Sequence, residues 1–304
     1  MRVPKALPMA LVISAMACAL PDAGAQTLRK VVDSNLITVS YRGASVPFSY
    51  LIAPNKPVGF AVDLTEAIVQ DVRDKLSKPG LQVAYRPVTG QTRIPQLVDG
   101  TYDLECGSTT NTSARGKDVS FSISYFFAGT RLLTRKESGI RSYADQNRKA
   151  VFTTAGSTNE KVIRKLAAER GLDVKITLGK DYDDAFQMVE SGQVAAFAMD
   201  DILLFGLRAN SKDPGSLDIV GDALQVEPYG CMTRKDDPEF KALVDGTLSR
   251  LIATGEFARL YAKWFESPIP PKNINLNMPM SDALKEFVKN PSDRGVDACG
   301  RMKC

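Results

Sequence analysis

The sequence predicts an α/β protein built from two parallel-sheet units. Segments with strand character alternate with amphipathic segments of helical periodicity along most of the chain, which is typical of α/β layers. The 304 residues are enough for about two domains, and a composition of 44% hydrophobic and 24% charged residues allows each domain a core of its own. The same order of strands and helices occurs twice, so we expect two sheets of similar construction.

The first cycle of elements occupies residues 36–106. A β-rich segment at 36–41 precedes an amphipathic stretch at 62–76, whose apolar side chains recur at helical spacing. Pro79 and Gly80 are expected to end this helix. A strand at 81–88, a short helix at 93–98 and a third strand at 102–106 complete the cycle.

The second cycle begins with a strand at 149–153. Ser157 and Glu160 then form a capping-box pattern for a helix that continues to residue 170. The remaining segments are a strand at 174–178, a helix at 182–191, a strand at 195–199 and a helix at 201–208.

Two extended runs, 122–133 and 224–232, bracket the second cycle as two crossover strands would, so the sequence favours a second unit inserted into the first. Amphipathic helices at 240–254 and 256–265 follow. Pro268 to Pro271 should end regular packing, and we expect the remainder to be a tail on the surface.

The first 25 residues have the pattern of a secretory signal peptide. Arg2 and Lys5 precede an apolar run of about 15 residues, shorter than the roughly 20 that a membrane span needs. Ala23 and Ala25 form an Ala-x-Ala cleavage pattern. We therefore expect cleavage after Ala25 and export to the periplasm, with lipid attachment at Cys18 as the alternative.

Composition excludes several function classes. The net charge of +4 is too small to indicate a nucleic-acid surface. The absence of histidine excludes Ser-His-Asp and Cys-His nucleophile systems and any histidine-containing metal site, and no cofactor or metal is expected. In an oxidising compartment the cysteines should form disulfides, and the four that follow the signal peptide allow three full pairings: Cys106, Cys231, Cys299 and Cys304.

Several short motifs resemble those of one family, the periplasmic polar amino acid binding proteins of ABC transporters (solute-binding protein family 3), and most closely its glutamate/aspartate binders. Their order and spacing from about residue 28 to residue 278 carry the resemblance. The motifs include Ser-Val-Pro-Phe-Ser-Tyr at 45–50, Arg-Ile-Pro at 93–95, Glu-Cys-Gly-Ser-Thr-Thr-Asn at 105–111, Gly-Thr-Arg-Leu-Leu at 129–133, Met-Asp-Asp at 199–201, Tyr-Gly-Cys-Met at 229–232 and Ser-Pro-Ile-Pro-Pro-Lys-Asn at 267–273.

The resemblance implies a two-lobed periplasmic binding protein fold of type II, with two doubly wound sheets joined by two hinge strands. Lobe 1 would comprise residues 26–124 and 230–275. Lobe 2 would be the inserted segment 125–229, and residues 276–304 would form a C-terminal tail.

The same resemblance implies how an amino acid is held by its common groups. Arg93 would bind the α-carboxylate through its planar guanidinium, and Asp200 would bind the α-ammonium. Ser108 and Thr110 follow a predicted strand, at the edge where α/β sheets bind ligands. The alternatives are a surface position for Arg93, simple turn capping by the two hydroxyls, and a structural role for Asp200; Asp201 competes with it as an acid at a helix N-cap.

Side-chain specificity would depend on other positions. Arg42 matches an arginine that meets the ligand side-chain carboxylate in the acidic amino acid binders. Gly90 and Tyr182 stand where the relatives resembled have serine and histidine, so two side-chain contacts differ. Arg115 matches an arginine near the cleft or serves as a structural clamp.

Ser157 and Thr158 open a helix whose free N–H groups suit an anion. Capping without ligand contact is the alternative for both residues.

The function implied is the capture of glutamate or aspartate by hinge closure and its presentation to a membrane permease. The protein would be a monomer that performs no covalent chemistry and binds no nucleic acid. Two alternatives stay open: an enzyme of the same fold, similar to cyclohexadienyl or arogenate dehydratases, and a binder of another polar amino acid such as glutamine.

A disulfide between Cys106 and Cys231 is expected from the implied two-lobed topology. The strand that returns to the first sheet after the second crossover, 229–234, would lie beside 102–106. The two cysteines would then approach within the roughly 4.4 to 6.8 Å between Cα atoms that a disulfide allows. Cys299 and Cys304 would pair with each other or remain thiols.

Overall fold

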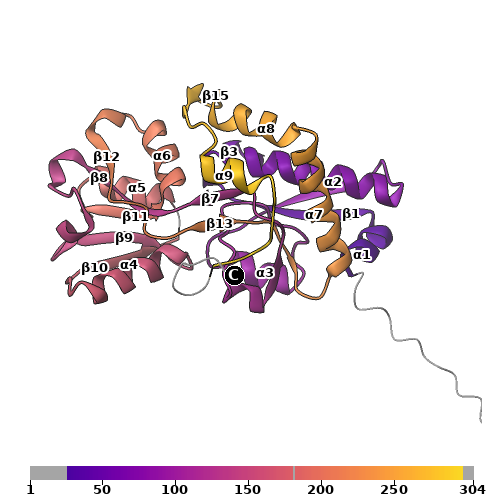
Figure 1. Ribbon diagram of the computed structural model, residues 1–304, viewed down its shortest axis with the longest axis horizontal. Coiled ribbons are helices and arrows are strands. Elements are labelled where there is room, and N and C mark those ends of the chain that lie inside the picture. The colour runs from indigo at the N-terminus through magenta and orange to yellow at the C-terminus, as the bar shows by residue number, and fades with distance from the viewer. Residues whose placement is uncertain (1–25, 181, 297–304) are drawn as a thin grey trace, which may run out of the picture.

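The computed structural model describes residues 26–180 and 182–296. The predicted signal peptide and Cys299 and Cys304 lie outside these residues. Figure 1 shows two lobes side by side, with extended strands running between them. In the described part of the chain, no helix is both long and apolar enough to cross a membrane.

The first lobe packs helices around a parallel strand pair. Strand β1 (Leu36–Tyr41) pairs with β5 (Gln82–Pro87) over six positions, and α2 (Phe60–Leu76) buries its apolar face beside them. The other elements of this lobe are α1 (Gln26–Ser34), β2 (Ala44–Ser45), β3 (Ser49–Ala53), β4 (Lys56–Val58), α3 (Arg93–Val98), β6 (Val119–Phe121), β14 (Met232–Arg234), α7 (Pro238–Ala253) and α8 (Glu256–Phe265). Most of their apolar side chains belong to a core that continues into the second lobe, whereas those of α3, β6 and β14 form a separate cluster.

Helix α2 ends at Leu76, as predicted, and begins at Phe60, two residues before the predicted start. Ser77 takes the left-handed conformation and its N–H bonds the carbonyls of Arg73 and Asp74, so the helix is capped before Pro79 and Gly80. The predicted strand at 102–106 is wrong. The segment 102–106 forms only isolated bridges, with Leu104 beside Val39 and Glu105 beside Met232. It changes partner after one residue, so no regular strand develops.

The second lobe has a mixed sheet, which corrects the expectation of parallel strands. The strands lie in the order β10 (Lys175–Gly179), β9 (Ala150–Thr154), β11 (Ala196–Asp200), β8 (Thr130–Arg135) and β12 (Leu217–Val220). Strand β8 is antiparallel to both its neighbours, because it enters directly from the hinge and runs outward. Strands β9, β10 and β11 are mutually parallel, so their carboxyl ends share the edge that faces the first lobe.

Helices α4 (Thr158–Glu169), α5 (Tyr182–Glu190) and α6 (Asp201–Asn210) follow β9, β10 and β11. The starts of these helices therefore lie at the same edge. This is the arrangement that places Thr158, Tyr182 and Asp200 toward the first lobe.

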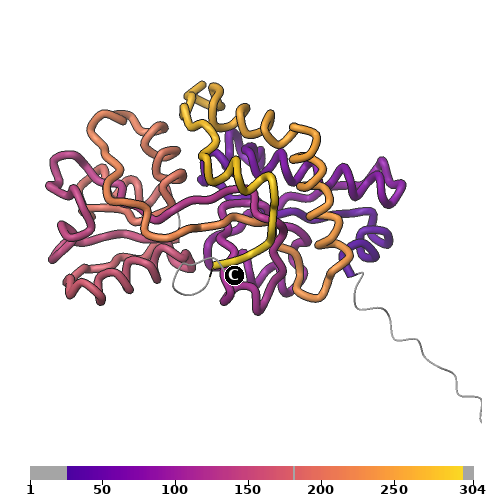
Figure 2. Tube along the Cα trace, in the orientation of Figure 1, coloured from indigo at the N-terminus to yellow at the C-terminus, as the bar shows by residue number. Residues whose placement is uncertain are grey.

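Two hinge strands connect the lobes, as the resemblance implied. Strand β7 (Phe126–Ala128) pairs antiparallel with β13 (Glu227–Tyr229), with Glu227 opposite Ala128 and Tyr229 opposite Phe126. Figure 2 shows these two segments crossing between the lobes beside each other. The expected lobe boundaries, 26–124 with 230–275 and 125–229, stay a prediction.

The C-terminal segment is more integrated than the expected surface tail. It contains β15 (Pro268–Ile269) paired with β16 (Ile274–Asn275), and α9 (Asp282–Phe287). Phe287 packs edge-on against Phe127 of the hinge, with ring centroids 4.8 Å apart. Val296 is fully buried and bonds Asn111 and Ser113 through its main chain. Phe287 packs on the hinge and other apolar residues of the segment pack against the core, which explains why it does not lie loosely on the surface.

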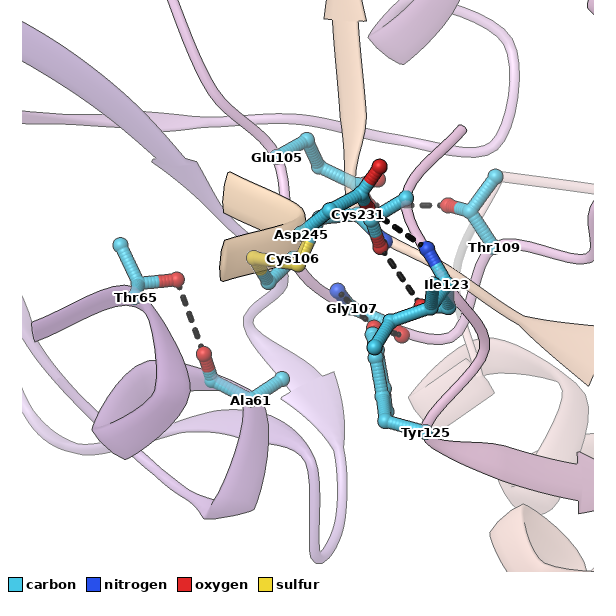
Figure 3. The surroundings of a disulfide bond; sticks show 11 residues. Ala61, Thr65, Glu105, Cys106, Gly107, Thr109, Ile123, Tyr125, Cys231 and Asp245 are labelled. Carbon is cyan, nitrogen blue, oxygen red and sulfur yellow. Dashed lines mark hydrogen bonds between the residues drawn. A yellow bond between two sulfur atoms is a disulfide. The ribbon is translucent and has the colours of Figure 1, made fainter. Parts of the chain in front are cut away.

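The predicted disulfide between Cys106 and Cys231 is confirmed. Their Cα atoms are 4.2 Å apart, and the bond joins residues separated by 125 positions in the sequence. Beside it, the backbones of Glu105 and Met232 exchange two hydrogen bonds of 3.2 and 2.7 Å. Figure 3 shows the disulfide next to Glu105 and Gly107, at the start of the loop that carries Ser108 and Thr110.

Candidate functional site

Residues from both lobes meet around a small cavity between them, with a volume of about 10 Å³. This is about the room that one water molecule needs, so the lobes lie tightly closed on each other here. Nine of the ten residues predicted to bind ligand lie around it, and Arg115 does not. The lining is Arg42, Gly90, Arg93, Ser108, Thr110, Thr154, Ser157, Thr158, Asn159, Tyr182, Met199 and Asp200. The structure brings these side chains together, and their contacts with a ligand stay a prediction.

Arg93 opens α3 and is buried at the first-lobe side of the cavity. Its Nη1 donates hydrogen bonds to the Ser108 carbonyl oxygen at 3.3 Å and to Thr109 Oγ1 at 2.5 Å. Among the described residues, neither Arg93 Nε nor Ser108 Oγ has a hydrogen-bond partner, although both atoms are buried. Unsatisfied buried polar atoms are costly, so this wall of the cavity is suited to a polar ligand.

Beneath Arg93 lies a buried carboxyl that the sequence interpretation missed. Thr109 accepts the hydrogen bond from Arg93 and donates one of 2.9 Å to Glu105 Oε1 (Figure 3). Burial raises the pKa of Glu105, and the nearby Arg93 opposes that rise. An acidic residue inside a predicted strand of the core was the available signal for it.

Asp200 lies at the carboxyl end of β11 and is 2% exposed. Asn159 Nδ2 donates a 2.9 Å hydrogen bond to its Oδ1, and the Tyr229 hydroxyl donates another to Oδ2. Burial raises the pKa of Asp200, and these two hydrogen bonds oppose the rise. The sequence interpretation missed both Asn159 and Tyr229, since each is remote from Asp200 along the chain.

The neighbouring acid, Asp201, has a different environment. Its Oδ1 accepts hydrogen bonds from the main-chain N–H of Ile202 at 2.7 Å and of Gly129 at 3.3 Å. Asp201 therefore fastens the start of α6 to the end of the hinge strand, while Asp200 lines the cavity.

The start of α4 contacts the hinge and the first lobe. Ser157 Oγ accepts a hydrogen bond from the N–H of Glu160, which is one half of the predicted capping box, and the Glu160 carboxylate accepts a hydrogen bond from Arg164 Nε. Thr158 Oγ1 donates a 3.0 Å hydrogen bond to Glu227 Oε2 and lies 3.4 Å from Thr110 Oγ1.

Arg42 and Tyr182 face each other across the cleft. The guanidinium carbon of Arg42 lies 4.9 Å from the centroid of the Tyr182 ring, within cation–π range. Both side chains are buried. The ring thus supports one face of the guanidinium, and the orientation of Arg42 depends on the second lobe.

Arg115, in a short helical turn (Arg115–Lys117), is not part of the cavity lining. Its Nη1 donates to the Thr110 carbonyl oxygen at 2.8 Å, and its Nη2 donates to the Gly156 carbonyl oxygen at 3.0 Å. These bonds join the first lobe to the start of α4. They fit the structural clamp that the sequence left as the alternative to ligand contact.

The chain was compared with known proteins. A family model described as bacterial extracellular solute-binding proteins, family 3, matches residues 37–267. A glutamate/aspartate import solute-binding protein of Escherichia coli (strain K12) is 46% identical over 279 residues, covering 92% of each chain. An L-glutamate/L-aspartate-binding protein of Pseudomonas aeruginosa (strain PAO1) is 42% identical over 300 residues, covering 98% of this chain and 99% of the relative.

Solved structures show the same fold. An ancestral arginine-binding protein bound to arginine has a TM-score of 0.67 and 30% identity, covering 76% of this chain and 98% of that one. An ancestral amino acid-binding protein, described as a precursor of cyclohexadienyl dehydratase, has a TM-score of 0.67 and 28% identity, covering 78% and 98%.

Proposed function

Because this chain belongs to the bacterial extracellular solute-binding proteins of family 3, we propose that it captures free glutamate or aspartate and delivers it to an ABC importer. The relatives named for glutamate and aspartate support this proposal over nearly the whole chain. The observation that carries it is a cavity in which buried arginines from one lobe oppose a buried aspartate from the other.

The common part of the ligand would be held by Arg93 and Asp200. The Arg93 guanidinium and Ser108 Oγ supply donors for the α-carboxylate, since each has a buried polar atom without a partner among the described residues. Asp200 supplies oxygens for the α-ammonium. Both ligand charges would thereby be paired in a site that excludes water.

The acidic side chain of the ligand would be bound by Arg42. Its planar guanidinium can donate two parallel hydrogen bonds to a carboxylate, and the Tyr182 ring packs against this guanidinium from the other lobe. Tyr182 adds no positive charge, and Gly90 adds no side chain, so Arg42 is the cation available for this part of the ligand. This assignment favours glutamate and aspartate over glutamine.

Ligand binding would stabilise the closed arrangement of the lobes. Asp200 and Thr158 belong to the second lobe, whereas Arg42, Arg93 and Ser108 belong to the first. A ligand that contacts both sets binds the closed form more tightly than the open form, and so shifts the population toward closure. A permease partner can then distinguish loaded from empty protein. We place this process in the periplasm, with the protein acting as a monomer and without enzymatic activity.

Calorimetry with a panel of amino acids tests the function. Glutamate and aspartate should bind, with glutamine, asparagine and arginine much weaker, and cysteate tests whether another side-chain anion is accepted. A preference for arginine or glutamine would contradict the acidic specificity. Incubation with prephenate or arogenate should give no product, and turnover of either would contradict the role as a transport protein.

A further inference from the structure

Glu227 is a buried carboxyl on the hinge strand β13 that the proposed ligand contacts do not use. It is 0% exposed. Thr158 Oγ1 donates a 3.0 Å hydrogen bond to Oε2, and Gln225 Nε2 donates to Oε1. Glu227 therefore accepts hydrogen bonds from neutral groups only, at the point where the start of α4 meets the hinge.

Buried acids and basic groups are balanced around the cavity. The acids are Asp200, Glu105 and Glu227, and each is at most 2% exposed. In the described part of the chain, no lysine or arginine nitrogen lies within 4.0 Å of any of these three carboxylates. The cations nearby are Arg42, Arg93 and Arg115. Three negative and three positive side chains therefore sum to zero when all are ionised.

An acidic amino acid would upset this balance. It carries two carboxylates and one ammonium, so its arrival leaves one negative charge in excess inside a site closed to water. Burying an uncompensated charge is costly, and the usual outcome is a change of protonation. One of the buried carboxyls is expected to become neutral.

We propose that the protein takes up a proton when it binds an acidic amino acid and that Glu227 is the group that accepts it. The inference rests on the proposed function. Asp200 is committed to the ligand ammonium, and Glu105 is linked to Arg93 through Thr109. Glu227 is left beside Asp200, and the guanidinium of Arg115 makes its bonds to carbonyl oxygens instead.

The surroundings of Glu227 agree with this assignment. Burial and the charge of Asp200 on β11 together raise the pKa of Glu227 to about 7, while Arg115 and the hydrogen bonds of nearby hydroxyls oppose the rise. Tyr229, on the same strand, also interacts with it electrostatically. A bound anion would raise the pKa again. Because the bound pKa is the higher one, affinity for the acidic ligand should fall as pH rises above 7.

The test is calorimetry on the full mature protein at pH 8, in phosphate and in Tris, two buffers with different ionisation enthalpies. The difference in heat gives the number of protons taken up. Wild type should take up between about half a proton and one proton per glutamate, and its affinity should fall by up to about tenfold per pH unit above pH 7. Glutamine, which is neutral, should cause no uptake. Glu227→Gln should bind glutamate with little uptake and a flat pH profile.

Matched variants assign the proton. Glu66→Gln removes another acid with a raised pKa, on α2 and outside the cavity, and should leave uptake unchanged. Undiminished uptake in Glu227→Gln, or loss of uptake in Glu105→Gln alone, would overturn the assignment to Glu227. Glutamate binding to wild type without proton uptake would overturn the inference and leave the proposed function standing. Failure of every amino acid to bind would instead overturn the proposed function. The wild-type comparison of glutamate with glutamine needs no variant to fold.

Discussion

Gly90 of the first lobe and Gly156 of the second lie directly against each other across the cleft. A Cβ atom on Gly156 would be 2.8 Å from the Gly90 carbonyl oxygen, and one on Gly90 would be 2.7 Å from the Ala155 carbonyl oxygen. Gly156 also has a φ of +77°, a conformation that other residues rarely adopt. The two backbones therefore meet with no side chain between them, and closure depends on that close approach.

Gly90→Ala should weaken binding of every amino acid alike. The added methyl group would press on a backbone oxygen that cannot move aside, at a cost of about 1 to 3 kcal/mol in the closed form. The open form has no such contact, so the melting temperature without ligand should stay close to that of wild type. Calorimetry and thermal unfolding measure the two quantities. Wild-type affinity in Gly90→Ala would mean that the lobes do not close this tightly on a ligand. Gly116→Ala, where no atom lies within 4 Å of the added Cβ, is the matched control.

Arg93→Ala should cost about 2 to 5 kcal/mol of binding free energy for all ligands, the usual penalty when one member of a buried charge pair is removed. The α-carboxylate is common to every amino acid, so the loss should not depend on the ligand side chain. Arg86→Ala, on the exposed end of β5, serves as the control for removal of an arginine. A loss confined to acidic ligands would mean that Arg93 binds the ligand side chain and not the α-carboxylate.

Asp200→Asn should abolish binding and stabilise the empty protein. Burial raises the pKa of Asp200, so the folded state holds a proton more tightly than the unfolded state. Such a group destabilises the fold above its unfolded pKa of about 4, and the effect fades as pH falls. The variant should therefore melt at a higher temperature than wild type at pH 8, with a smaller difference at pH 5. A rise of about 2 to 4 °C is expected for each kcal/mol relieved.

The neighbouring acid provides the control. Asp201→Asn keeps a side-chain oxygen to accept the hydrogen bonds from Gly129 and Ile202, so it should retain ligand binding. Equal loss of binding in both variants would leave the two acids without separate roles. A lower melting temperature for Asp200→Asn at pH 8 would mean that its two hydrogen bonds outweigh the burial of its charge.

Local patterns in the sequence predicted most of the helices and strands. They also identified most of the residues that line the cavity. The bounds of β1, α3 and α8 agree with the sequence, because periodicity and helix signals act within a few residues. Strand direction does not have a local signal. Strand β8 reads like its neighbours, yet it is antiparallel to them because it continues from the hinge.

The sequence interpretation missed some residues near the cavity for the same reason. Asn159 looks like an ordinary polar residue in the first turn of a helix, and Glu227 like a polar residue before a strand. Their contacts join positions 41 and 69 residues apart, to Asp200 and Thr158. Only the paired hinge strands and the shared sheet edge bring these groups together, so no short window of sequence contains the information.

Arg42→Ala should weaken glutamate and aspartate more than glutamine, by about 1.5 to 3 kcal/mol, the range for hydrogen bonds to charged groups. All ligands should lose some affinity as well, because the contact between Arg42 and the Tyr182 ring also links the lobes. Tyr182→Phe keeps the ring and separates the two effects, since it should preserve the preference for acidic ligands. Equal losses across the panel for Arg42→Ala would make Arg42 a structural residue.

Removal of the disulfide should lower stability and spare binding. The bond between Cys106 and Cys231 closes a loop of 125 residues, for which the chain-entropy estimate is about 4 to 5 kcal/mol. Arg93 belongs to α3, and its guanidinium bonds the Ser108 carbonyl oxygen and the Thr109 hydroxyl. None of these contacts includes a cysteine. Cys106→Ala combined with Cys231→Ala should therefore melt well below wild type and still bind glutamate at low temperature. Cys299→Ser with Cys304→Ser is the matched control for loss of two cysteines. Two results would contradict the role of this bond in holding the segment 102–106 against β14. One is an unchanged melting temperature after reduction. The other is a free thiol at Cys106 in non-reducing peptide maps of the exported protein.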